Sequence, residues 1–166
     1  KSKKFCVFAM LNNAANTKTN LPAQIGVGMT TYTSADEVTR GELMFAQNML
    51  GSTGQAMYIK EERMIDASTA ISGSGPAYVF YFMKSMIDGA LSLGFSQSEA
   101  EQLVKQTFRG SVQLQSRSDQ SMEDWIAKVA SKGGTTEAAL NSFGASVETD
   151  IKKGLKAAYD RAVKLS

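Results

Sequence analysis

The chain has 166 residues, of which 43% are hydrophobic and 20% are charged, and its formal net charge is +2. A chain of this composition can bury a core, and so small a net charge does not favour binding to nucleic acid or to an anionic membrane surface. Histidine is absent and Cys6 is the sole cysteine, which excludes Ser-His and Cys-His catalysis, the usual zinc sites and an internal disulfide.

The first 60 residues have the pattern of an α/β segment. Residues 4–9 are short and apolar, as in a buried strand, and the polar residues 12–20 predict a loop. β-Branched and aromatic side chains predict a second strand over residues 27–33, and residues 57–59 suit a third.

A capping motif between these strands predicts a helix. The Ser34 hydroxyl can accept a hydrogen bond from a free backbone N–H, and the Glu37 carboxylate can reach back to the start of the helix. We expect this helix to run to about Leu50 and to end at Gly51.

From residue 61 onwards the pattern predicts almost only helix. Ser96 and Glu99 form a second capping box, and Gly94 is expected to end the helix before it. The expected helices cover residues 61–70, 77–93, 96–117, 121–130 and 137–143, and Ser146 is expected to cap a last one. The fold class is therefore mostly α, with a helical bundle preceded by an incomplete α/β segment.

The helix expected over residues 77–93 is apolar on nearly every side, and such a helix must be surrounded by other elements. We therefore expect it to be buried against a second subunit, with a central helix in a monomeric bundle as the alternative. No apolar run of the chain reaches the length of a membrane span.

Two glycine-rich turns each precede a predicted helix. The first is Ser72-Gly73-Ser74-Gly75, and its glycines let the backbone approach a ligand closely. The second, S-K-G-G-T-T over residues 131–136, offers two consecutive glycine N–H groups and two hydroxyls beside a helix N-terminus, which suits a carboxylate. Taken alone, either turn could also be an ordinary connection between helices.

Together these segments resemble pyrroline-5-carboxylate reductase. D-A-S-T-A-I-S-G-S-G-P-A-Y, over residues 66–78, matches one signature of that family closely. K-V-A-S-K-G-G-T-T, over residues 128–136, resembles a second signature, usually written T-S-P-G-G-T-T. P-A-Q-I-G-V-G, over residues 22–28, resembles the run at the end of the family's nucleotide domain. The resemblance extends from about Leu21 to Ser166.

The resemblance implies reduction of 1-pyrroline-5-carboxylate to L-proline with NADPH or NADH, the last step of proline biosynthesis. It also implies an N-terminal Rossmann domain and a C-terminal helical domain that interleaves into a homodimer, with higher rings such as a decamer. In this chain, residues 1–62 would be a partial nucleotide-binding domain and residues 63–166 the helical substrate-binding and dimerisation domain. The resemblance further implies a cytoplasmic location, and the single cysteine fits a reducing compartment.

The resemblance assigns roles to the matching positions. In the second loop, the backbone and hydroxyl groups are expected to hold the substrate carboxylate, while a hydroxyl and an acidic residue lie near the ring nitrogen as catalytic groups. The first turn and a proline upstream are expected to approach the nicotinamide, and no metal is expected. The carboxylate site comprises Ser131, Gly133, Gly134, Thr135 and Thr136; the catalytic residues are Thr136 and Asp119; the cofactor-binding residues are Pro22, Ser72, Gly73, Ser74 and Gly75.

The sequence departs from the family pattern in three places. Lys132 replaces the usual proline of the second signature, and K-T-N-L-P over residues 18–22 stands where M-P-N-T-P is expected. Only 65 residues precede the first signature, where domain size calls for roughly 150. We expect residues 1 to about 20 to be separate pieces of a longer protein, with chain breaks before Leu21; a natural or engineered truncation is the alternative.

The leading interpretation is thus a pyrroline-5-carboxylate reductase. A non-catalytic oligomerisation module, which keeps the fold but does not bind NAD(P)H, is the second. A helical partner-binding bundle outside the family is the third, and it requires both glycine turns to be coincidental. A related imine or ketimine reductase would use the same carboxylate loop.

Overall fold

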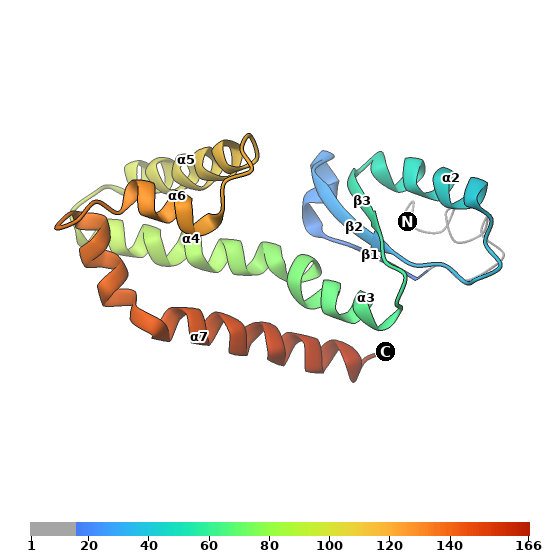
Figure 1. The fold of residues 1–166 in the computed structure, drawn as a ribbon. Coiled ribbons are helices and arrows are strands. Elements are labelled where there is room, and N and C mark those ends of the chain that lie inside the picture. Colours follow the sequence, from blue (N-terminus) through green and yellow to red (C-terminus); the bar gives the residue numbers. More distant parts are fainter. Residues whose placement is uncertain (1–15) are drawn as a thin grey trace. The chain divides into compact units, whose positions relative to one another are not determined.

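The computed structural model describes residues 16–166, which form two compact units (Figure 1). The first unit contains the described residues up to Tyr78 together with Lys153–Ser166, and the second is Val79–Lys152. The strand predicted at residues 4–9 lies outside the described residues, as does most of the segment in which chain breaks are expected. Both stay predictions.

The first unit is built on a three-stranded sheet with the order β1-β2-β3. Its strands are β1 (Thr17–Thr19), β2 (Gly28–Tyr32) and β3 (Gly54–Tyr58). β1 is antiparallel to β2, and β3 is parallel to it. The strands expected at residues 27–33 and 57–59 are confirmed. The loop expected over residues 12–20 is wrong at β1, because this threonine-rich stretch pairs with β2, with Lys18 opposite Thr31.

The buried strand β2 carries hydroxyl groups into the interior of the first unit. Thr30 and Thr31 are each 1% exposed, and Tyr32 is 2% exposed. The buried hydroxyls have partners: Thr30 Oγ1 lies 2.9 Å from Thr19 Oγ1, and Thr31 Oγ1 lies 2.6 Å from Ser68 Oγ. Burial of these polar groups is therefore compensated by hydrogen bonds.

Helix α2 (Arg40–Gly51) connects β2 to β3 and runs beside β3 (Figure 1). Its cap is Thr39: the Glu42 N–H donates to Thr39 Oγ1, and the Glu42 carboxylate accepts from the Thr39 N–H at 2.8 Å. The start predicted from Ser34 is wrong, because the Ser34 hydroxyl is hydrogen-bonded to that of Tyr58. Gly51 is the last residue of the helix, close to the predicted end.

Two helices and a π-helical turn follow one another almost without interruption. They are α3 (Arg63–Ser68), η2 (Thr69–Gly73) and α4 (Gly75–Ser92). The Ser74 N–H donates to the Thr69 carbonyl, five residues back, at 2.9 Å. The open turn predicted at residues 72–75 is therefore wrong, since the chain passes through it as a bulge in a helical path. Gly94, with φ +99°, follows α4 as expected.

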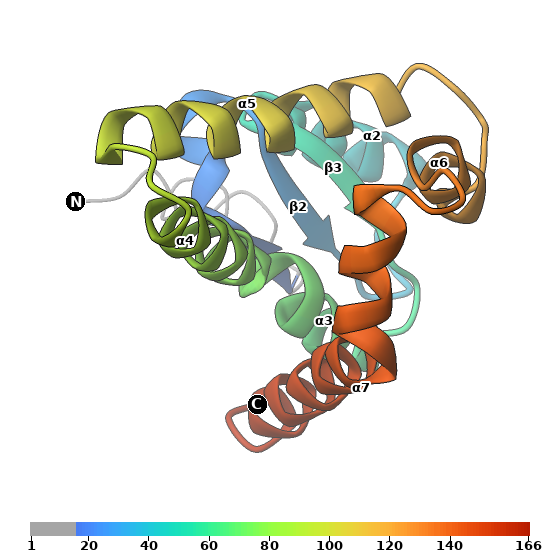
Figure 2. The ribbon, with the colours of Figure 1, turned by 90° about the vertical axis from the view of Figure 1, so that its left-hand side faces the viewer.

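The second unit contains most of α4 and the helices that the sequence predicts after it. They are α5 (Gln97–Gln115), α6 (Met122–Val129) and the first part of α7 (Thr135–Val163) (Figure 2). Ser96 and Glu99 form the predicted capping box at α5. Ser121 caps α6 as predicted, accepting from the Asp124 N–H at 3.1 Å.

Helix α7 is kinked at Gly144, where φ is +54° and ψ is −163°. The predicted separation of the last two helices is thus confirmed as a kink. Ser146 is not a cap, because the helix resumes directly after Gly144 and the Ser146 hydroxyl donates to the Phe143 carbonyl at 2.8 Å. The end of α7 lies beside α3, where Ser166 Oγ donates to Asp66 Oδ1 at 2.7 Å (Figures 1 and 2).

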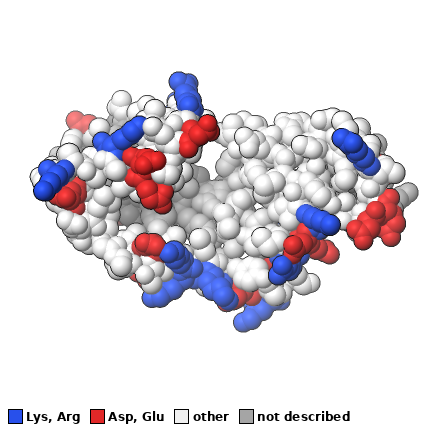
Figure 3. Space-filling model, viewed as in Figure 1, with Lys and Arg blue, Asp and Glu red and all other residues white. Residues whose placement is uncertain are grey.

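Large apolar side chains remain exposed on the helices. Helix α4 has no buried residue, and Phe80 and Tyr81 are 58% and 69% exposed. The face in Figure 3 has wide areas without charged side chains. No helix in the described part of the chain combines the length and apolar character needed to cross a membrane. The chain by itself therefore leaves much apolar surface uncovered.

Candidate functional site

A short turn joins α6 to α7 and contains most of the predicted carboxylate site. The Gly134 N–H closes the turn by donating to the Ser131 carbonyl at 2.9 Å. Gly133 has a φ of +74°, which a glycine adopts without steric cost. Helix α7 begins at Thr135, so Thr135 and Thr136 form its first turn and do not belong to the loop, where the sequence placed them.

The second glycine of this turn is required by a close approach. A Cβ on Gly134 would lie 2.6 Å from Ser131 Oγ and 3.0 Å from the Ser131 carbonyl oxygen. Hydrogen at this position therefore lets the Ser131 hydroxyl fold over the turn. The two glycines thus have different roles. Gly133 adopts the left-handed conformation of the turn, and Gly134 leaves room for the Ser131 side chain.

The electrostatics of the turn favour an anion. The N-terminus of α7 carries the positive end of the helix dipole, and Lys132 is exposed beside it. In this structure the Gly133 N–H donates to Glu137 Oε2 at 2.7 Å. Of the two glycine N–H groups predicted to bind a carboxylate, that of Gly133 is thus bonded to a carboxylate of the chain itself. The N–H of Gly134 closes the turn.

The predicted catalytic residue Asp119 lies in the exposed segment between α5 and α6. This segment is tied to α6, because Lys128 Nζ donates to Gln120 Oε1 at 2.5 Å and lies 4.6 Å from the centroid of the Trp125 ring. Asp119 and the 131–136 loop belong to the same unit, at the two ends of α6.

The predicted cofactor-binding residues 72–75 lie in the π-helical turn and just after it. All four are half-buried, and neither glycine has a positive φ. The backbone conformation of these residues therefore does not require glycine. A Cβ on Gly75 would meet nothing within 4 Å, so the space beside this residue is open. Small side chains here leave open space beside a rigid helical backbone.

Two residues that support this turn were not found by sequence reasoning. Ser68 Oγ donates to the Ile65 carbonyl at 2.8 Å and is joined to Thr31 Oγ1 of the sheet. Thr69 Oγ1 donates to the same carbonyl at 2.9 Å. The sequence showed only hydroxyl residues in a strand and in a helix, and no pattern links positions 37 residues apart.

Pro22, the remaining predicted cofactor residue, lies half-buried in the 3₁₀ helix η1 (Leu21–Ile25). The Val27 N–H donates to the Pro22 carbonyl at 3.3 Å, which folds the P-A-Q-I-G-V-G run back on itself. A Cβ on Gly28 would lie 2.5 Å from Ala23 Cβ, so glycine is needed for this packing. The glycines of this run therefore serve a tight turn into β2.

The predicted residues fall into two groups by unit. Ser131 to Thr136 and Asp119 lie in the second unit, whereas Pro22 and Ser72 to Gly75 lie in the first. The residues predicted for the substrate and those predicted for the cofactor thus lie in different units. Among the described residues, no group of three or more acidic or cysteine side chains could hold a metal ion.

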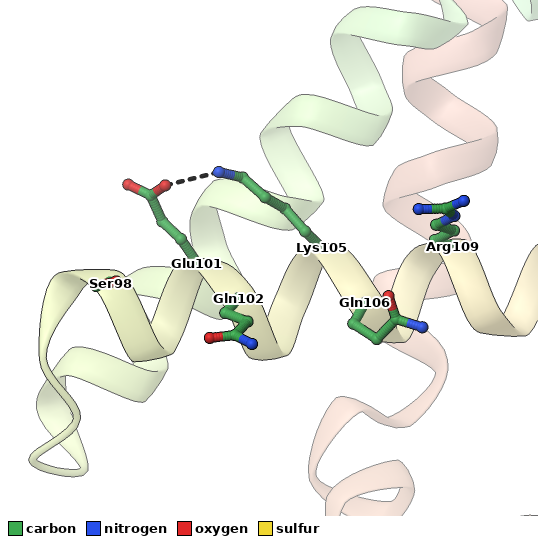
Figure 4. Close-up of a pocket in the computed structure, with 6 residues that line it drawn as sticks. All are labelled: Ser98, Glu101, Gln102, Lys105, Gln106 and Arg109. Atoms are coloured by element: carbon green, nitrogen blue, oxygen red, sulfur yellow. Dashed lines mark hydrogen bonds and ion pairs between the residues drawn. The ribbon is translucent and has the colours of Figure 1, made fainter.

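A shallow pocket that the sequence did not indicate lies along α5 (Figure 4). It contains none of the predicted site residues. Glu101 and Lys105 form an ion pair of 2.7 Å. The hydrogen bond from the Gln97 amide, and then Lys105, lower the pKa of the Glu101 carboxyl. The lining residues are Ser98, Glu101, Gln102, Lys105, Gln106 and Arg109. Nothing in this lining favours the reaction implied by the two signatures.

Comparison with known proteins identifies relatives over most of the chain. The family model described as pyrroline-5-carboxylate reductase dimerisation matches residues 62–165. A pyrroline-5-carboxylate reductase of Pseudomonas aeruginosa is 36% identical over 148 residues, covering 89% of this chain and 54% of its own length. The chain therefore spans about half the length of the curated relatives it matches.

Solved structures show the same similarity in three dimensions. A pyrroline-5-carboxylate reductase from Coxiella burnetii superimposes with a TM-score of 0.88 at 30% identity, covering 93% of this chain and 57% of that one. A Plasmodium falciparum pyrroline carboxylate reductase with NADP bound has a TM-score of 0.85 at 31% identity, covering 92% and 58%.

Proposed function

Since the chain belongs to the pyrroline-5-carboxylate reductase family, we propose that it carries the substrate-binding and dimerisation part of an enzyme that reduces 1-pyrroline-5-carboxylate to L-proline. One observation of the structure supports this most: the turn between α6 and α7 already holds a carboxylate, that of Glu137, on the Gly133 N–H. Residues 1–62 then belong to the nucleotide-binding domain and residues 63–166 to the helical domain.

The substrate carboxylate binds at the turn through the Gly133 backbone. The hydroxyls of Ser131, Thr135 and Thr136 supply further donors, and the N-terminus of α7 supplies a favourable potential. The Gly134 N–H joins them when the turn opens its bond to Ser131. Lys132, in place of the family's proline, adds a cation that draws the anionic substrate to the site.

The imine nitrogen of the substrate lies near Thr136 and Asp119. A hydroxyl and a carboxylate there stabilise the protonated iminium, the form that accepts a hydride most readily. NADPH or NADH supplies that hydride when bound. The chain contributes position and electrostatics, and it needs no covalent nucleophile.

The residues proposed to hold the cofactor fit a flat ring. Ser72 to Gly75 form a half-buried stretch of small side chains, and the space beside Gly75 is open. Pro22 provides a rigid edge in the first unit as well. These residues would contact the nicotinamide, whereas the pyrophosphate needs groups beyond those described here, since the G-V-G run of residues 26–28 serves a turn.

The apolar helix α4 forms the dimer interface. Phe80 and Tyr81 are more than half exposed, and helices with such surfaces are normally covered by a partner. The match to a dimerisation family supports a second copy of the chain as that partner. Assembly of dimers into rings such as a decamer, and a cytoplasmic location, are further parts of the proposal.

A substrate-dependent assay tests the proposal. The purified chain and its Thr136→Ala variant are mixed with NADPH and pyrroline-5-carboxylate, and NADPH absorbance is followed. We expect oxidation that depends on the substrate and falls strongly in the variant. A folded dimer without turnover would favour a non-catalytic oligomerisation module instead.

A further inference from the structure

The side chain of Glu137, in the first turn of α7, occupies the carboxylate loop in this structure. We infer that Glu137 is an internal ligand, and that an incoming carboxylate must displace it. This inference rests on the proposed function of the loop. It makes Glu137 a residue that sets the affinity of the site for anions.

The contact has the geometry of a charge-assisted hydrogen bond. Glu137 Oε2 accepts from the Gly133 N–H at 2.7 Å, and such bonds are about twice as strong as those between neutral groups. Glu137 is the third residue of α7, so its side chain can reach back over the helix N-terminus. The bond joins positions four apart, and Gly133 turns its N–H toward the helix through its left-handed conformation.

Ligand and Glu137 compete for one site. A single N–H forms one strong bond with one carboxylate, and two negative groups within hydrogen-bond distance of it repel each other. The substrate therefore binds only after the Glu137 side chain has rotated away. The apparent affinity of any anion is reduced by the fraction of time for which Glu137 occupies the loop.

This competition lowers the apparent affinity of every anion by the same factor, so the ligands that bind weakly lose their occupancy of the loop first. A simple anion such as acetate makes contacts with the loop alone, and it loses translational freedom when it binds. Glu137 makes the same kind of contact without that loss, because it is already part of the chain. A cyclic amino acid also contacts groups outside the loop, such as Thr136, and can outcompete the internal ligand. The residue thus keeps small cellular anions out of the site.

Glu137 also resembles the acidic member of a capping box, which stabilises a helix start. The two roles are separable by substitution. Glu137→Gln keeps a side chain that can accept the Gly133 hydrogen bond but removes the charge, while Glu137→Ala removes both. Glu148→Gln, farther along α7 in an exposed ion pair with Lys152, is the matched control for the change in net charge.

The experiment measures the dissociation constants of L-proline and of acetate for the 166-residue chain and these variants, by titration with amide NMR. We expect L-proline to bind about twofold to fivefold more tightly to Glu137→Gln, and at least as tightly to Glu137→Ala, as a charge at a helix terminus implies. The gain for acetate is expected to be of the same size. Glu148→Gln is expected to match the parent chain.

The outcomes separate this inference from the proposed function. Binding of L-proline at residues 131–136 with equal constants in all variants would overturn the role of Glu137 and leave the proposed function standing. Weaker binding in both Glu137 variants would do the same, and would make Glu137 part of the binding surface. Failure of every folded variant to bind L-proline would overturn the proposed function of the loop, and this inference with it.

Discussion

Thr31 on β2 and Ser68 on α3 are joined by a hydrogen bond of 2.6 Å between their hydroxyl groups. Ser68 directly precedes the π-helical turn, and Thr31 is buried in the sheet. The buried strand therefore fixes the place where the π-helical turn begins, and this turn leads into the half-buried residues 72–75. A rigid support of this kind positions a site more precisely than a loop can.

Loss of this bond should destabilise the first unit. We predict that Thr31→Val lowers the free energy of unfolding by about 1 kcal/mol, because Ser68 keeps its bond to the Ile65 carbonyl but loses its partner in the sheet. Urea unfolding measures the change. Ser116→Ala, which removes an exposed hydroxyl bonded only to its own helix, is the control and should change little.

Gly134→Ala should damage the carboxylate loop. The new Cβ would lie 2.6 Å from Ser131 Oγ and 3.0 Å from the Ser131 carbonyl oxygen, so the Ser131 side chain must rotate away and the backbone of the turn must shift. We expect a loss of stability of about 1 kcal/mol or more and weaker binding of L-proline. The control is Gly154→Ala in α7, which meets nothing within 4 Å and should stabilise the chain by about 0.5–1 kcal/mol. Unchanged binding in Gly134→Ala would argue against the loop geometry.

The capping box of α5 should make stability depend on pH. The Ser96 hydroxyl, and then its backbone N–H, lower the pKa of the Glu99 carboxyl from 4.5. The folded state therefore favours the charged form of Glu99. The contribution of this carboxylate to the free energy of unfolding is complete above pH 4.5 and is lost as the pH falls through the lowered pKa. Glu99→Gln should be less stable than the parent at pH 7, with the difference fading below pH 4.5.

A second substitution checks the origin of that effect. In a Ser96→Ala background, Glu99→Gln should have a smaller effect, because the carboxylate has lost the hydroxyl and keeps only the backbone N–H of residue 96. A difference of the same size at pH 7 and pH 3 would show that the box does not titrate as described.

A charge on the exposed face of α4 should separate the proposed dimer. Tyr81 is 69% exposed, so Tyr81→Asp places a charge on this face, and within the chain it removes only the edge-to-face contact with the exposed Phe82 ring. We predict a shift from dimer to monomer in analytical ultracentrifugation at micromolar concentration. Gln102→Asp, at an exposed polar position of α5, is the control and should stay dimeric. A parent chain that is already monomeric would contradict the proposal.

Local chemistry predicted several helix boundaries well. Ser96 with Glu99 and Ser121 formed the expected caps, because each motif had no competing neighbour. Near α2 the sequence holds two such motifs, and Thr39 with Glu42 caps the helix while the Ser34 hydroxyl bonds to Tyr58 of β3. A partner 24 positions away in the sequence decided this, and such a contact is not visible in a local pattern.

The site itself was only partly predictable. The S-K-G-G-T-T run predicted an anion-binding turn, and the structure has a turn there that leads into a helix; binding of an anion to it stays a prediction. It could not indicate that the Glu137 side chain reaches back to Gly133. The π-helical path through residues 69–73 was likewise hidden, since glycines suggest an open turn, whereas here they keep a helical backbone free of side chains.

A crystal structure of the chain with bound L-proline would test the central claim most directly. We predict the ligand carboxylate within hydrogen-bond distance of the Gly133 N–H and the Thr135 or Thr136 hydroxyl, with the Glu137 side chain turned away from the loop. L-Proline bound elsewhere, with Glu137 still on Gly133 in the presence of saturating ligand, would contradict the account.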